Sequence, residues 1–265
     1  MAKSDEQDFS YTAGLKAAEH DLPVLVDLLS RTEANRVVRF KALSGTARQL
    51  RALEEILTYT KELEIYFRSQ EQVSQVAFLL HRVHGDFATS IEALLSGFHK
   101  TVLDSMRDVM EIEFLFRDFT LHHAHIGEWL TASEKLRRNK FQAGSLRQRY
   151  AASMGQAPAD MREATDYRGH SMLLHVLPYE NPIVSATPSE ARDAIGSLVC
   201  LYDIVEHAHR LFAAVSGFCD SFKLSYPEAK EFLKSALAVW QECQKHWNRV
   251  APILGGSEPK VSSRA

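Results

Sequence analysis

The chain has few of the features that mark whole classes of proteins. Only three of its 265 residues are cysteines, and these three, Cys200, Cys219 and Cys243, are widely spaced in apolar stretches. We therefore expect reduced, buried thiols. No apolar run approaches the roughly 18 residues that a membrane span needs, and the acidic start, Met-Ala-Lys-Ser-Asp-Glu-Gln-Asp, is unlike a signal or transit peptide. The sequence predicts a cytoplasmic protein without a membrane partner.

An excess of charge and the common catalytic loops are also missing. The chain has 31 Lys and Arg against 34 Asp and Glu, a formal net charge of -3. Any attraction to nucleic acid or acidic lipid must therefore come from a local patch. The sequence has no glycine-rich phosphate loop, no closely spaced cysteine pair and no nucleophile elbow. The sequence therefore lacks the signatures of several large enzyme classes.

A helical spacing of apolar residues runs through most of the chain. Apolar side chains recur at intervals of three and four, and alternating β-branched runs are scarce. We find no internal repeat of roughly 30 to 45 residues, which argues against a helical solenoid. The fold class predicted is all-α, a single irregular helical bundle.

The expected organisation has five parts. Residues 1–10 and 254–265 are polar tails, 11–70 form N-terminal helices, 71–222 form the helical core, and 223–253 carry a C-terminal helix. We also expect the following helices and breaks: a short helix starting at Pro23, a helix over 33–68 bent near Gly45, a break at Ser96-Gly97, a helix ending near Thr120, short pieces broken at Gly127, Gly144 and Gly155, and helices over 158–176 and 189–222.

A polar stripe interrupts one of these apolar helices. Tyr167, Ser171 and His175 are spaced four and four, and Arg168 lies beside them. Arg168 and His175 are seven positions apart, which places them about 20° apart on one helix face. Buried polar groups need partners, so the stripe either faces a cleft or belongs to a hydrogen-bonded network between helices that has no chemical role.

An Arg followed six residues later by a His, near the start of a late helix in an all-α domain, resembles the motif of the HEPN superfamily. Here the pair is Arg168 and His175. The surrounding pattern is similar to a group of bacterial helical domains in which Arg and Glu four apart, here Arg107 and Glu111, precede a helix reading Tyr, Ser and His at four-residue steps. The resemblance covers residues 71–222. It departs at Gly169, where the superfamily usually has a polar residue.

The resemblance implies metal-independent cleavage or binding of RNA, in a toxin or defence system, without a cofactor. His175 would move a proton and Arg168 would stabilise the charge on the phosphate. Seven helical residues span about 10 Å, which is too far for one chain to bring both groups easily to one phosphate. Two copies packed antiparallel about a two-fold axis would bring Arg168 of one copy close to His175 of the other. We therefore expect a homodimer, with Gly169 allowing the two helices to approach closely.

A second Arg and His pair competes with the first. Arg117 and His122 fit the local consensus slightly better, but on a straight helix they lie about 140° apart. They are therefore the second choice for the functional pair. The neighbouring His123 and His125 complete no spaced set of metal ligands with His122, and no metal site is expected there.

Two further charged features admit a structural and a functional interpretation. Arg107 and Glu111 are either a pair that stabilises helix packing or extra phosphate contacts beside His175. A second feature is a segment of six cations that contains no acid and in which Phe141 and Tyr150 also occur. This segment either binds RNA or forms a solvated helix face. These six are Lys135, Arg137, Arg138, Lys140, Arg147 and Arg149.

The alternative to a nuclease is a non-enzymatic helical module that binds a partner protein. In that case the stripe is structural, and the long helical surfaces bind the partner protein. Exposure distinguishes the two readings: Arg168 and His175 lining a cleft or a dimer interface favour the nuclease, whereas His175 enclosed by apolar neighbours favours the scaffold.

Overall fold

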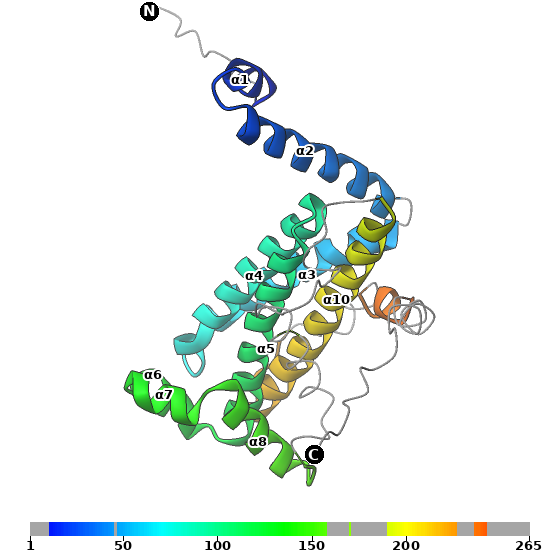
Figure 1. Cartoon of the computed structure of the whole chain (residues 1–265). Coiled ribbons are helices and arrows are strands. Elements are labelled where there is room, and N and C mark those ends of the chain that lie inside the picture. Colours follow the sequence, from blue (N-terminus) through cyan, green and yellow to red (C-terminus); the bar gives the residue numbers. More distant parts are fainter. Residues whose placement is uncertain (1–10, 45–46, 158–169, 171–189, 227–235, 243–265) are drawn as a thin grey trace, which may run out of the picture.

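The computed structural model describes residues 11–44, 47–157, 170, 190–226 and 236–242. Within these ranges the chain is helical and has no strand, which confirms the all-α bundle. The helices, shown in Figure 1, are α1 (Tyr11–Ala18), α2 (Pro23–Ser44), α3 (Ala47–Ser69), the 3-10 turn Ser74–Val76, α4 (Ala77–Ser96), α5 (His99–Leu121), α6 (Ala124–Thr131), α7 (Glu134–Lys140), α8 (Ala143–Ser153) and α10 (Glu190–Ser221).

Helix α5 is the centre of the bundle. It packs along α4 and α10, while α3 packs against α4 and α10, and α6 and α8 contact α5 (Figure 1). The first residue of α5, His99, lies with Nε2 3.4 Å from the Ser197 hydroxyl near the start of α10. Just after α5 ends, His123 Nε2 lies 2.9 Å from the hydroxyl of Ser221, the last residue of α10. The two central helices therefore run side by side in the same direction.

Aromatic side chains from three helices form the core between them. Phe67 of α3, Phe116 of α5 and Phe218 of α10 are mutual neighbours, with ring centroids 5.2 to 6.1 Å apart. Helix α3 also buries Ala52, Leu53, Ile56, Tyr59 and Leu63 in the same cluster. The packed core thus begins before residue 71, where we had expected it to start. The apolar stripe of α3 is as regular as those of the later helices, and burying it requires the same partners.

The N-terminal helices differ most from expectation. Helix α2 begins at Pro23 as expected but continues to Ser44, so the single helix expected over 33–68 is instead the pair α2 and α3. The second half of α2 contacts α4: Asn35 donates to the carbonyl of Ser96, and Arg36 pairs with Glu92. The rest projects from the bundle with α1 (Figure 1).

Glycine ends helices at two of the expected breaks but not at the others. Gly97 terminates α4 with φ of 89°, and a Cβ there would lie 2.7 Å from Arg39 Nη2. Gly155, with φ of 66°, follows α8. Gly127 and Gly144, in contrast, lie inside α6 and α8. The chain turns instead at Ala132 and Gln142, where the backbone is extended. A helical glycine costs only about 1 kcal/mol, so packing decides.

Two findings concern the chain as a whole. Among the described residues, no helix combines the length and apolar character required to cross a bilayer. Cys200 and Cys219 are buried free thiols, as expected, and Cys243 lies outside the described residues.

Candidate functional site: a buried His-Asp-His cluster

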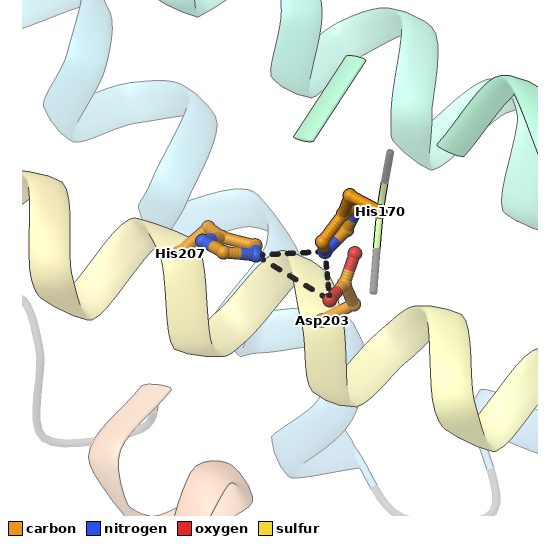
Figure 2. A group of neighbouring side chains, drawn as sticks. All are labelled: His170, Asp203 and His207. Atoms are coloured by element: carbon orange, nitrogen blue, oxygen red, sulfur yellow. Dashed lines mark hydrogen bonds and ion pairs between the residues drawn. The ribbon is translucent and has the colours of Figure 1, made fainter. Parts of the chain in front are cut away.

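Three ionisable side chains meet inside the bundle. Asp203 and His207 are four residues apart on α10 and so share one face of that helix. His170, from the segment before α10, points at both of them (Figure 2). His170 Nε2 lies 3.1 Å from Asp203 Oδ1 and 3.3 Å from His207 Nε2, and His207 Nε2 lies 3.4 Å from Asp203 Oδ1. One atom from each residue therefore points to a common centre.

The cluster is shielded from solvent. His207 is 1% exposed, His170 is 4% exposed, and the Asp203 side chain is 14% exposed. Burial alone would raise the pKa of Asp203, but the two facing imidazoles outweigh burial and hold that pKa well below its usual range. The other ring nitrogen of His170, Nδ1, lies 3.2 Å from the Leu103 carbonyl oxygen on α5. His170 thus contacts both central helices.

A second buried network lies further along the same two helices. The carboxylate of Glu113 is completely buried and accepts a hydrogen bond from Arg117 Nε at 2.8 Å. Its other oxygen lies 3.1 Å from Arg210 Nη2, three residues beyond His207 on α10. Arg117 also donates to the hydroxyl of Tyr150 on α8, and its guanidinium lies over the Tyr150 ring. The buried carboxylate therefore has a cationic partner for each of its oxygens, inside a bundle where an unpaired ion is costly.

Asp118, the residue after Arg117, anchors the short helices against α5. Its buried carboxylate lies 2.7 Å from Arg149 Nε on α8 and 2.8 Å from His125 Nδ1 on α6. Arg149 also donates to the carbonyl of Lys140 at the end of α7. A single buried carboxylate thus holds α6, α7 and α8 in place, which is a structural role.

The predicted catalytic stripe lies outside the described residues. This applies to Tyr167, Arg168, Ser171 and His175, so their exposure and mutual geometry stay predictions. His170, from the same stretch of sequence, is described, and sequence reasoning passed over it. Its imidazole contacts both α5 and α10.

The second-choice pair does not share a described contact. Arg117 is directed at Glu113 and Tyr150, whereas His122 is exposed and packs against the ring of His125, with centroids 4.7 Å apart. His123 stacks on Phe222 instead. His122 and His125 are therefore ring neighbours, but His123 lies elsewhere, so the three histidines do not meet at one point.

Arg107 and Glu111 form an ion pair along α5, with Nε and Oε1 3.7 Å apart, and both are partly exposed. They line a cavity of about 380 Å³ between α4 and α5. The opposite wall supplies Arg82 and Asp86 from α4, and Arg82 makes a bidentate contact with Asp108. The pair therefore faces a charged cavity rather than apolar surroundings.

The six cations predicted to bind RNA lie on α7 and α8, and most of them have protein partners. Arg138 pairs with Glu134, Lys140 with Glu128 and Arg149 with Asp118, while Arg137 and Arg147 donate to backbone carbonyls. Lys135 is exposed. Phe141 is buried beneath Lys140 and Arg149, so it is not available to stack on a base.

An open pocket nevertheless forms between α7 and α8 within this segment. It has a volume of about 490 Å³, and its lining contains two cations, three neutral polar side chains and no acid. The lining residues are Asn139, Lys140, Ser145, Gln148, Arg149 and Ala152. The acids that pair with Lys140 and Arg149 hold them from outside the pocket.

Sequence reasoning named neither Asp203 nor His207 as a site residue. The available signal was Asp203 four residues before His207, a spacing that puts a carboxylate and an imidazole on one helix face. His209 points elsewhere and stacks on Trp240, with ring planes 10° apart. The third member, His170, is 33 residues away from Asp203 in the chain, and only tertiary packing brings it there.

Comparison with known proteins adds no name to this site: the chain matches no protein-family model, no curated protein and no solved structure.

Proposed function

We propose that this protein is a HEPN-like, homodimeric RNA-binding protein that cleaves RNA without a catalytic metal or cofactor, with Arg168 and His175 as the catalytic pair. The role in a toxin or defence system belongs to the same proposal and rests on the motif resemblance. The observation that supports RNA contact is the acid-free pocket between α7 and α8.

The pocket suits a phosphate chain for two reasons. Lys140 and Arg149 are each held by an acid outside the lining, which orders their side chains before a ligand arrives. The remaining lining side chains, Asn139, Ser145 and Gln148, are neutral hydrogen-bonding groups. A positively charged groove that follows the backbone is one of the two components of sequence-independent binding to single-stranded RNA.

Cleavage is tested with purified protein and total RNA in the presence of chelator. We expect wild type to cleave, and His175→Ala and Arg168→Ala to lose most of the activity, because proton transfer and charge stabilisation contribute factors of roughly 10² or more each. His20→Ala, which alters an exposed imidazole on the N-terminal segment, serves as the control and should cleave like wild type. Equal cleavage by all the variants, or none by wild type, excludes catalysis by this pair.

Binding is tested separately by anisotropy of a fluorescent single-stranded RNA. We expect Lys140→Gln to weaken binding and to lower the salt dependence by about one counterion. The matched control is Lys100→Gln, since Lys100 also pairs with one acid, Asp104, but lies on α5 outside the pocket. Equal affinities for both variants would exclude the pocket as the RNA site.

The dimer is tested by light scattering of the pure protein, and a monomer at micromolar concentration contradicts it.

A second candidate function, a protein-interaction module, is favoured by the surface of α2. Val24 is 82% exposed and Val38 is 64% exposed, and Leu25, Leu28 and Phe40 are also exposed on this helix. An apolar surface of this kind on a projecting helix is typical of a binding face. The module is favoured if wild type does not cleave RNA and an Arg168→Ala, His175→Ala double variant still binds every cellular protein that wild type binds.

A further inference from the structure

We propose that His170, Asp203 and His207 form a binding site for one divalent transition-metal ion of the zinc and iron(II) class. This goes beyond the proposed RNA function and does not depend on it. The three side chains come from two segments of the bundle and point at a common centre (Figure 2).

The spacing of the three atoms is that of metal ligands. His170 Nε2, Asp203 Oδ1 and His207 Nε2 are separated pairwise by 3.1, 3.3 and 3.4 Å. Ligands about 2.0 to 2.1 Å from a tetrahedral zinc ion lie roughly 3.3 to 3.4 Å from one another, and three ligands on one face of an octahedron lie about 3.0 Å apart. An ion near the centre of this triangle would reach normal coordination distances without moving the backbone.

The orientation of His170 supports the same conclusion. Nδ1 of His170 lies 3.2 Å from the carbonyl oxygen of Leu103, and because a carbonyl only accepts, a hydrogen bond between these two atoms places a hydrogen on Nδ1. In the neutral ring the lone pair is then on Nε2, which faces the Asp203 carboxylate at 3.1 Å. In this tautomer the neutral ring offers the carboxylate no hydrogen, so a cation between Nε2 and Oδ1 is what holds the two atoms this close. A carbonyl that orients a histidine through its other nitrogen is also the usual support of a metal ligand.

The cation between them is either a metal ion or a proton on an imidazolium. The second oxygen of Asp203 favours the metal. Oδ2 is buried, and the described part of the chain offers it no hydrogen-bond partner. A proton on His170 satisfies Oδ1 alone, whereas a metal ion takes a carboxylate through one or both oxygens. Burial of an unsatisfied carboxylate oxygen costs free energy that coordination would recover.

The ligand types select the class of ion. Two imidazole nitrogens and one carboxylate suit zinc, iron(II), cobalt(II) or nickel(II), whereas magnesium and calcium prefer oxygen ligands alone. Three protein ligands also leave at least one coordination position for water or another small ligand. Such an ion would connect His170 to α10, and the carbonyl of Leu103 contacts His170 from α5.

The test measures metal binding by the full-length chain, purified without a histidine tag. Metal content is determined by mass spectrometry, and the chelator-treated protein is then titrated with zinc and with cobalt. We expect one equivalent per chain, a visible absorption band for the cobalt form, and a rise in Tm with zinc that magnesium does not produce, because a ligand that binds only the folded state stabilises it.

Two variants and one matched control assign the ligands. Asp203→Asn and His207→Gln should lose the bound equivalent, the cobalt band and the zinc-dependent rise in Tm. His209→Gln alters a histidine two residues further along the same helix, outside the cluster, and should bind like wild type. Circular dichroism verifies that each variant is folded.

Wild-type protein decides the proposal even where a variant does not fold. If chelator-treated wild type binds neither zinc nor cobalt and shows no change in Tm, the site is a buried ion pair and the proposal is wrong. If wild type binds but folded Asp203→Asn binds equally well, the ion lies elsewhere and the assignment is wrong. RNA cleavage is not measured in either arm, so failure here leaves the proposed function unaffected.

Discussion

The guanidinium of Arg210 on α10 lies 3.1 Å from the completely buried carboxylate of Glu113 on α5. Arg117, one turn after Glu113, contacts the other carboxylate oxygen at 2.8 Å. One acid is thus shared by two arginines where the two central helices meet. This arrangement costs desolvation, but once it is made, removal of the shared acid leaves two cations in a site of low polarity.

Replacement of Glu113 should therefore destabilise the protein strongly. We expect Glu113→Gln to lower the free energy of unfolding by about 3 to 5 kcal/mol, the usual cost of breaking a buried ion pair. The matched control is Glu134→Gln, which breaks a similar four-residue pair with Arg138 in which both side chains are more than three-quarters exposed. That variant should lose less than about 1 kcal/mol. Urea unfolding measures both, and equal small losses would contradict the buried network.

Two glycines on α10 should respond oppositely to the same substitution. A Cβ at Gly196 would lie 2.5 Å from Cε1 of the buried His99 ring, so Gly196→Ala requires a shift of α5 or of this ring. We expect a loss of about 1 to 3 kcal/mol. Gly217 has no atom within 4 Å of an added Cβ, and Gly217→Ala should gain about 0.5 to 1 kcal/mol from helix propensity. Thermal unfolding compares them, and stabilisation by both would contradict the close contact at His99.

Asp86 should make stability fall as pH rises towards neutrality. Burial, together with the nearby Asp108 carboxylate, raises the pKa of Asp86 to about 7, although Arg82 opposes the shift. A carboxyl whose pKa is higher in the folded state favours folding below its unfolded pKa of about 4, and this contribution is lost as pH rises to about 7. Asp86→Asn should remove this loss and be more stable than wild type by about 1 kcal/mol or more near pH 8.

The comparison for Asp86 is the difference in unfolding free energy between mildly acidic and mildly alkaline buffer. Asp104→Asn is the control, because Asp104 lines the same cavity but is half-exposed and pairs with Lys100. A pH profile of Asp86→Asn parallel to that of wild type would show that Asp86 is ionised throughout.

Glu64 should have the opposite pH dependence. Burial alone would raise the pKa of Glu64, but hydrogen bonds from Lys61, Arg68 and His81 outweigh it and lower that pKa to about 2. The stabilisation is therefore complete above the unfolded pKa of about 4.5 and is lost as pH falls from there to about 2. We expect Glu64→Gln to be less stable at neutral pH and to lose less on acidification. Glu62→Gln, an exposed neighbour on α3, should retain the wild-type acid profile.

Sequence reasoning was most successful where the determining interactions are local. The Ser96-Gly97 break, the end of α5 near Thr120 and the start of α10 at Glu190 all follow from spacing, proline and glycine within a few residues. It failed at Gly127 and Gly144, because local glycine preference is weaker than the packing of α6 and α8. It also placed α3 outside the core, because periodicity reveals an apolar face but not the helix it packs against.

The candidate site shows the same limit at single residues. Asp203 and His207 form a visible four-residue pair, yet nothing local indicates that His170 joins them across 33 residues of chain. The basic segment was recognised from its composition, but the acids that pair with it, Glu128 and Asp118, precede it in the sequence on other helices. The surface of α7 and α8 therefore carries less unpaired positive charge than the run of cations in the sequence predicts.

The amino-acid order alone determined that the chain forms helices and belongs to the all-α class, and that Cys200 and Cys219 lie on apolar helix faces as buried, free thiols. Backbone hydrogen bonds and apolar spacing act over one or two turns, so both are visible in the sequence. Which ionisable groups meet inside was decided only by how α5, α10 and His170 pack, since burial makes each polar group take whichever partner the fold brings within reach.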